Sequence, residues 1–227
     1  MTLPALVPVA ATLGARTAEQ LRQKITQGEF LPGQRLSEQA LSDSLGISRN
    51  TLREVFRMLI SDGLVKHEPN RGVFVAVPTV ASIVDIYRVR RLIECQALAQ
   101  AYPRHPAKKK MRMAVEQALE CRTRADWLGA GTANMAFHMA IVELADSERL
   151  NLLFASVLAE LRLAFGMLRD AESLHVPYVD MNLQILVLAE AGDFARAAVT
   201  LTDYLVNSER IVLAVYARHL SAAAALA

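Results

Sequence analysis

The chain has 227 residues, enough for one large domain or two smaller ones, and 53% of them are hydrophobic against 21% charged. This composition excludes an intrinsically disordered protein, because disordered chains are poor in hydrophobic residues. The formal net charge of +2 excludes a histone-like polybasic coat, and two cysteines are too few for a disulfide framework. No charge-free stretch of the sequence reaches the roughly 18 to 20 residues that cross a bilayer, so we expect a mainly α-helical, cytoplasmic protein without a membrane partner.

Composition along the chain predicts three parts. Residues 1–16 are apolar, but Pro4 and Pro8 interrupt them and no basic segment precedes them, so we expect a disordered arm rather than a signal peptide. Residues 17–77 contain short apolar patterns, typical of helices and strands, that are separated by turns. Residues 78–227 contain long patterns of aliphatic residues at helical spacing. Lys and Arg outnumber Asp and Glu by 9 to 7 up to Val77 and equal them at 16 to 16 beyond it, so the whole positive excess lies in the N-terminal third. A hinge is expected at Val77-Pro78-Thr79.

The elements expected between residues 17 and 77 are three helices followed by a hairpin. A first helix runs from Thr17 to about Gln27, and a second one begins at Ser37 and ends at Gly46. Ser48 caps a third helix, which runs to residue 60. Two strands, 64–68 and 72–77, are joined by a turn.

The third helix has one apolar and one polar face. Its apolar residues recur at i, i+3, i+4 and i+7, namely Leu52, Val55, Phe56 and Leu59. Arg49, Asn50 and Arg53 lie on the opposite face near the start of the helix, where such side chains can bind base edges in the major groove of DNA. The hairpin turn is then a wing whose Arg71 contacts phosphate or the minor groove. The alternative is a small α+β domain whose arginines form a solvated face, but the order of the elements favours DNA binding.

Four motifs in this part carry a family resemblance. They are Gly28-x-Phe30-Leu31-Pro32-Gly33-x-Arg35-Leu36-Ser37-Glu38, Leu45-Gly46-Ile47-Ser48-Arg49-x-Thr51-Leu52-Arg53-Glu54, Gly63-Leu64-Val65 and Arg71-Gly72-x-Phe74-Val75. Together they resemble the GntR family of bacterial transcription regulators, which implies a winged helix-turn-helix domain.

The resemblance also implies roles for single residues. Arg49 and Arg53 are expected to contact bases and phosphates, Ser48 and Thr51 to contact phosphates, and Gly72 to let the wing backbone approach DNA. Arg35 either contacts DNA or packs against its own loop. Many members have an arginine directly after the residue matched by Glu38, and Gln39 stands there in this chain, which affects base preference or affinity at that contact.

Residues 78–227 are expected to form an all-α antiparallel bundle. Helical patterns run over 79–101, 108–124, 132–145, 147–168, 178–191 and from 193 to beyond 216, and the apolar run 127–142 indicates a buried helix. Three motifs resemble the FCD effector domain of the FadR-like branch: Tyr87-x-Val89-Arg90-Arg91-x-Ile93-Glu94, Phe137-His138 and Gly192-Asp193-x-x-x-Ala197. The resemblance implies a domain that dimerises and binds a small acidic metabolite, which changes the affinity for operator DNA.

Most FCD domains hold a divalent metal with an aspartate, the histidine of Phe-His and two further histidines. The matching positions here are Asn134, His138, Asn182 and Tyr204, so only His138 retains a ligand of the family. Amides and a phenol are poor ligands for a divalent ion, so we expect no metal and no other cofactor. His175 would lie on the same face as Asn182 only if Pro177 leaves that helix unbroken.

Two interpretations of this polar set are open. Asn134, His138, Asn182 and Tyr204 either bind an effector, with Arg90 pairing with its carboxylate, or bond one another and a water. Arg162 is a further candidate or a surface residue.

The sequence thus predicts a homodimeric repressor that binds double-stranded operator DNA and responds to a small carboxylate. A ligand-independent DNA-binding protein is the alternative. An enzyme that uses His138 is not favoured, because no nucleophile–base pair or Gly-rich phosphate loop accompanies it, and we expect no catalytic residue.

Overall fold

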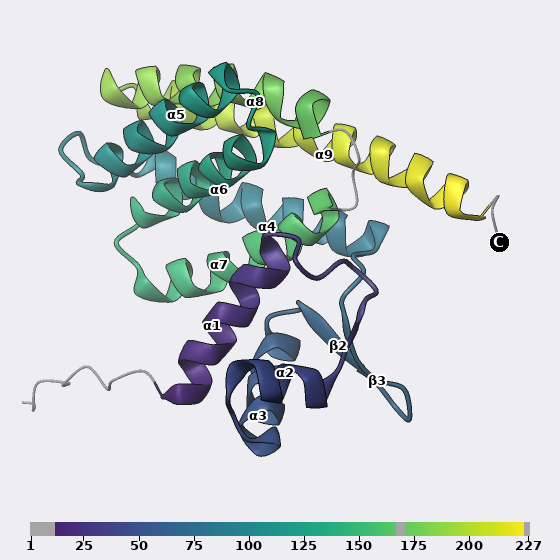
Figure 1. Cartoon of the computed structure of the whole chain (residues 1–227). Helices are drawn as coiled ribbons and strands as arrows, with labels where there is room; N and C mark the ends of the chain where they lie inside the picture. Colours follow the sequence, from purple (N-terminus) through teal and green to yellow (C-terminus); the bar gives the residue numbers. More distant parts are fainter. Residues whose placement is uncertain (1–11, 167–170, 225–227) are drawn as a thin grey trace, which may run out of the picture. The chain divides into compact units, whose positions relative to one another are not determined.

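The computed structural model describes the backbone of residues 12–166 and 171–224 and the side chains of residues 12–166 and 176–218. The chain divides into an N-terminal unit that ends at Ala76 and a C-terminal unit that begins at Val77 (Figure 1). The sequence places this boundary one residue later. Residues 1–11 of the expected arm, and the side chain of His175, lie outside the described residues.

The N-terminal unit contains helices and a small sheet. Its elements are α1 (Leu13–Thr26), β1 (Arg35–Leu36), α2 (Glu38–Leu45), α3 (Arg49–Ser61), β2 (Val65–Glu68) and β3 (Gly72–Val75). The sheet is antiparallel in the order β1-β3-β2, with Leu36 and His67 both paired with Val73. The order of helices and hairpin is as predicted, whereas the two-residue strand β1 was not expected from the sequence.

The first helix begins earlier than predicted. The prediction that it starts at Thr17 is wrong, because the Thr12 side chain caps a helix that starts at Leu13: the Thr12 hydroxyl accepts a hydrogen bond of 3.2 Å from the amide of Ala15. Residues 13–16 of the expected disordered arm are therefore helical.

The core of the N-terminal unit is built on α3. Its apolar stripe is buried as predicted, with Leu52, Val55, Phe56 and Leu59 at most 3% exposed. This stripe packs against α1, α2 and β2, so the opposite face of α3 is left toward solvent. Burial of one face thus fixes which side chains α3 presents.

The C-terminal unit is an all-α bundle. Its elements are α4 (Val80–Ala99), α5 (Ala107–Thr123), α6 (Trp127–Glu143), α7 (Glu148–Gly166), α8 (Ala171–Glu190) and α9 (Phe194–Ala224). Helix α6 contacts α4, α5, α7 and α8, while α9 packs on α4 and α8. None of the helices in the described ranges has the length and apolar character needed to span a membrane. The expected mainly α fold, a winged helix-turn-helix followed by a helical bundle, is confirmed.

Two helix starts in the bundle differ from the sequence prediction. Helix α6 begins at Trp127, as the apolar run 127–142 indicates, and not at Thr132, because Asp126 caps it by accepting from the amide of Gly129 at 2.9 Å. Helix α8 begins at Ala171, so the prediction that it starts after Pro177 is wrong. Proline has no backbone N–H, so it removes one hydrogen bond of the helix. Pro177 lies in the second turn of α8, and the helix continues beyond it.

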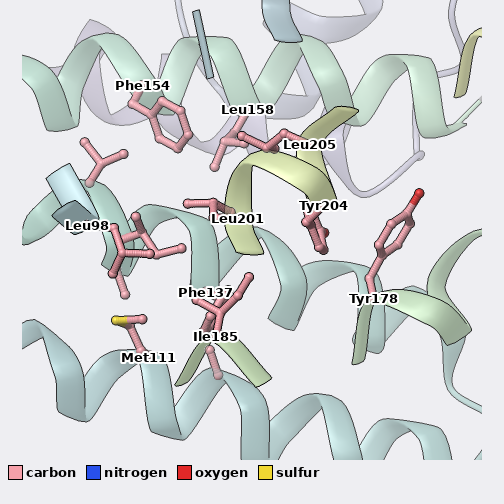
Figure 2. Packing of buried hydrophobic residues seen from close by; sticks show 14 of the residues in the cluster. Leu98, Met111, Phe137, Phe154, Leu158, Tyr178, Ile185, Leu201, Tyr204 and Leu205 are labelled. Carbon is pink, nitrogen blue, oxygen red and sulfur yellow. The ribbon is translucent and has the colours of Figure 1, made fainter. Parts of the chain in front are cut away.

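Helix α6 carries polar side chains into the bundle. It is apolar nearly all round, with small residues at Ala130, Gly131 and Ala133 that allow close approach of its neighbours. Asn134 and His138 are one turn apart on it and are both buried. In Figure 2, Phe137 and Tyr204 lie in the packed interior near Leu201 and Tyr178. The only way to bury such polar groups without a large penalty is to pair them.

Candidate functional site

The exposed face of α3 begins at a tight turn. Gly46 ends α2 in the left-handed conformation, with φ of 64°, and Ser48 then caps α3. The Ser48 hydroxyl accepts from the amide of Thr51 at 3.1 Å and lies 2.9 Å from the Thr51 hydroxyl. This places Arg49 and Asn50 in the first turn of α3, where free backbone N–H groups also favour an anion such as phosphate.

Two of the three arginines of α3 are held by side chains of α2. Arg53 Nε donates to Glu38 Oε2 at 3.3 Å, and Arg49 Nη2 donates to Gln39 Oε1. Both arginines are exposed. Arg53 also lines a cleft of about 680 Å³ together with Asn50 and Thr51. The predicted residues of α3 therefore lie together on one accessible and partly hollow surface.

The wing brings Arg35, Arg71 and Gly72 together. Asn70 and Gly72 have positive φ, at 63° and 107°, as the turn between β2 and β3 requires. Arg71 is exposed, lies over the ring of Phe74 and pairs with Glu68 at 2.5 Å. A Cβ atom at position 72 would meet Arg35 Nε at 3.4 Å, so the Arg35 guanidinium lies against the wing glycine.

A second polar site lies inside the C-terminal unit, and we call it the buried cluster: Arg90, Glu94, Asn134, His138, Asn182 and Tyr204. Arg90 Nε donates to Glu94 Oε1 at 2.7 Å, and these side chains are 2% and 0% exposed. The other oxygen of Glu94 contacts His138 Nδ1. The five residues predicted from the sequence are thus brought together, and Glu94 is the sixth member.

Hydrogen bonds continue from His138 across the bundle. His138 Nε2 lies 3.0 Å from the Tyr204 hydroxyl, which donates to Asn134 Oδ1 at 3.1 Å. Asn182 Nδ2 donates to the same Asn134 oxygen at 2.7 Å. Helices α4, α6, α8 and α9 all contribute to this network, so it ties together segments far apart in the sequence.

Burial and charge set the protonation of the cluster. Burial raises the pKa of Tyr204 well above its ordinary value, so the phenol stays protonated. Burial also lowers the pKa of His138, against the opposing effect of Glu94. For Glu94, burial acts to raise the pKa, but Arg90 and His138 outweigh it and lower the pKa. The cluster at neutral pH therefore contains the Arg90–Glu94 ion pair and a protonated Tyr204 phenol.

Two polar atoms of the cluster are left over. Arg90 Nη2 and Asn182 Oδ1 are buried and have no hydrogen-bond partner among the residues that the structure describes. A buried polar group without a partner is costly, and such atoms are where a ligand or an ordered water binds. The cluster thus has one spare donor and one spare acceptor.

The Glu94–His138–Tyr204 chain resembles an acid–base relay in its order of groups. Its members are at most 1% exposed, and the raised pKa of Tyr204 opposes formation of a nucleophilic phenolate. The arrangement links α4, α6 and α9 through hydrogen bonds, and it is unsuited to activating a nucleophile.

Comparisons with known proteins identify both units. The family model described as "Bacterial regulatory proteins, gntR family" matches residues 13–75, and that of the FCD domain matches residues 85–207. A solved structure of a putative transcriptional regulator GntR from Rhodococcus sp. RHA1 is 40% identical, covers 88% of this chain and 97% of that chain, and has a TM-score of 0.85. The chain belongs to the GntR family.

Curated relatives agree with this assignment. The HTH-type transcriptional regulator YdhC of Bacillus subtilis is 30% identical over 143 residues, or 61% of this chain and 63% of that protein, so the match spans less than two thirds of the relative. The gluconate operon transcriptional repressor of Bacillus subtilis is 33% identical over 84 residues, or 37% of this chain and 34% of that protein. This GntR-family chain, with its FCD domain, is a DNA-binding transcriptional regulator.

The buried cluster does not fit the divalent metal that the FCD family implies. Asn134 Oδ1 already accepts from Asn182 and Tyr204, and His138 Nε2 faces the Tyr204 hydroxyl. The cationic Arg90 guanidinium belongs to the same cluster and opposes a second positive charge. No group of three or more His, Cys, Asp or Glu side chains suited to a metal ion occurs within the described residues.

The sequence does not indicate Glu94 as the partner of Arg90 and His138. Glu94 was part of a motif, but its contact with His138 joins α4 to α6 and has no local signal. The available signal was that Arg90 and Glu94, a charged pair spaced i, i+4, lie inside the apolar stripe of α4. Such a pair indicates buried charges, because buried charges are normally paired. Arg162 donates to Leu128 and Thr132 at 3.4 and 3.3 Å, so it contacts the start of α6.

Proposed function

We propose that this GntR-family regulator is a homodimeric repressor that recognises operator DNA with α3 and the wing. The observation that carries the proposal is the exposed face of α3, on which Arg49, Asn50 and Arg53 lie together. A dimer would present two such helices to the half-sites of a pseudo-palindromic operator. Repression is supported by the name of the gluconate operon relative, which is similar to this chain over 84 residues.

We further propose that a small carboxylate binds at the buried cluster and changes the affinity for DNA. Arg90 uses Nε for Glu94 and keeps Nη2 for a carboxylate, while Asn182 Oδ1 can accept from a hydroxyl or acid group. The alternative, a ligand-independent regulator, is supported by the hydrogen bonds that Asn134, His138, Asn182 and Tyr204 already make with one another.

One titration tests both proposals. We expect labelled DNA from the chain's own promoter region to bind more tightly than scrambled DNA in fluorescence anisotropy, with affinity that falls as salt rises. We also expect at least one member of a panel of small organic acids to shift that affinity and to raise the melting temperature of the protein. Equal binding of both DNAs would contradict the DNA proposal. Specific binding that no acid alters would favour the ligand-independent alternative.

A second expectation concerns metal content. We propose that the cluster works without a divalent ion, and we expect elemental analysis of the purified protein to find less than stoichiometric metal. The triple variant N134D/N182H/Y204H supplies the family's ligand types and is the matched control, because it should bind a divalent ion in the same assay. A stoichiometric ion in the wild-type protein that a chelator removes with loss of stability would overturn this proposal.

A further inference from the structure

The side-chain amide of Gln39 links the two helices of the helix-turn-helix. Its Nε2 donates to the two carboxylate oxygens of Asp43 at 2.9 and 2.7 Å, and its Oε1 accepts from Arg49 Nη2. Gln39 and Asp43 are one turn apart on α2, and Arg49 is the first residue of α3. A chain of hydrogen bonds therefore runs from Asp43 through Gln39 to Arg49.

The chemistry of Asp43 fixes the orientation of this amide. An ionised carboxylate accepts hydrogen bonds and donates none, so Asp43 selects the Nε2 side of Gln39. The Oε1 side then faces α3, where Arg49 supplies donors. A glutamate at position 39 would place a second negative charge four residues from Asp43, which is unfavourable on a helix. An amide satisfies both neighbours at once.

Arg49 and Arg53 of α3 are held in different ways. Arg53 is paired with the carboxylate of Glu38, which offsets its charge, whereas Arg49 is held by a neutral group and keeps its full charge. A guanidinium has five N–H donors, and the bond to Gln39 uses one of them. Arg49 is thus oriented but still has donors for a base edge.

We propose that Gln39 is a positioning residue for sequence recognition: it holds the Arg49 guanidinium in place before DNA binds and so sets the base preference of Arg49. This inference rests on the proposed function, in which Arg49 contacts DNA. Ordering a flexible side chain at an interface reduces affinity by roughly 2- to 10-fold, and an arginine that is already held avoids that loss.

The test is selection of bound sequences from a random DNA pool by the full-length chain, followed by affinity measurements on the selected site. R49A identifies the base pair that depends on Arg49. We expect Q39A to weaken the preference at that same base pair by about 2- to 10-fold, the range for one released side chain, and to leave the other positions unchanged. D43A should act at the same base pair, because it frees the amide of Gln39 to turn.

Gln23 provides the matched control. It is an exposed glutamine whose Nε2 donates to Glu19 at 3.1 Å, also four residues away, but it lies on α1. Q23A should leave every base preference unchanged, and far-UV circular dichroism checks that all variants are folded. Unchanged preference in Q39A at the position that R49A alters would overturn the inference about Gln39. A wild-type chain that enriches no sequence would instead overturn the proposed function, and the inference with it.

Discussion

Replacing Glu94 with glutamine should lower the free energy of unfolding of the C-terminal unit by about 3 to 5 kcal/mol. Glutamine has nearly the same shape, but it leaves the Arg90 guanidinium buried at 2% exposure without an opposite charge. The single tryptophan, Trp127, lies at the start of α6, so urea unfolding followed by its fluorescence reports on this unit.

Two further variants separate lost charge pairing from general damage. Glu143→Gln removes an ion pair of 2.6 Å with Lys110 that is far more exposed, and it should change stability by at most about 1 kcal/mol. The double variant R90M/E94Q removes the uncompensated charge while keeping an acceptor for His138, so it should recover most of the loss. A Glu94→Gln protein that matches the Glu143→Gln protein in stability would show that the charge of the buried Arg90–Glu94 pair does not stabilise this unit.

Features with a local signal were predictable from the sequence. The third helix was predicted because Gly46 ends one helix, Ser48 caps the next and an apolar stripe follows at helical spacing. The start of α1 was missed because its cap, Thr12, lies inside an apolar segment that resembles an arm. Pro177 predicts a helix boundary, yet packing of α8 against α5, α6 and α9 outweighs the loss of one backbone hydrogen bond.

Features that depend on tertiary contacts were not predictable. The i, i+4 spacing places Asn134 and His138 on one face, and the family resemblance groups them with Asn182 and Tyr204, which do bond to them, but nothing near them in sequence indicates Glu94 as a partner. The Gln39 bond to Arg49 is equally hidden, because it spans the turn between two helices. The DNA contacts and the effector contacts stay predictions, since they depend on molecules outside this chain.

The double variant R49A/R53A should lose the preference for promoter DNA over scrambled DNA by at least about 30-fold. Each arginine that binds a base edge contributes about 1 to 3 kcal/mol of discrimination, and about 1.4 kcal/mol corresponds to tenfold. Arg53 must also leave or share Glu38 to reach DNA, so R53A alone should have the smaller effect of the two single variants. Fluorescence anisotropy with both DNAs, at several salt concentrations, separates loss of discrimination from loss of total charge.

Two arginines of α5 give the matched charge control for this experiment. Arg112 pairs with Glu190 and Arg122 with Asp180, at 2.6 and 2.7 Å, and both lie in the C-terminal unit. R112A/R122A lowers the formal net charge from +2 to 0, the same change that R49A/R53A makes. If charge alone attracted DNA, the two double variants would bind alike. Because base contacts require placement on α3, we expect R112A/R122A to keep its sequence preference, and equal loss in both variants would contradict recognition by this helix.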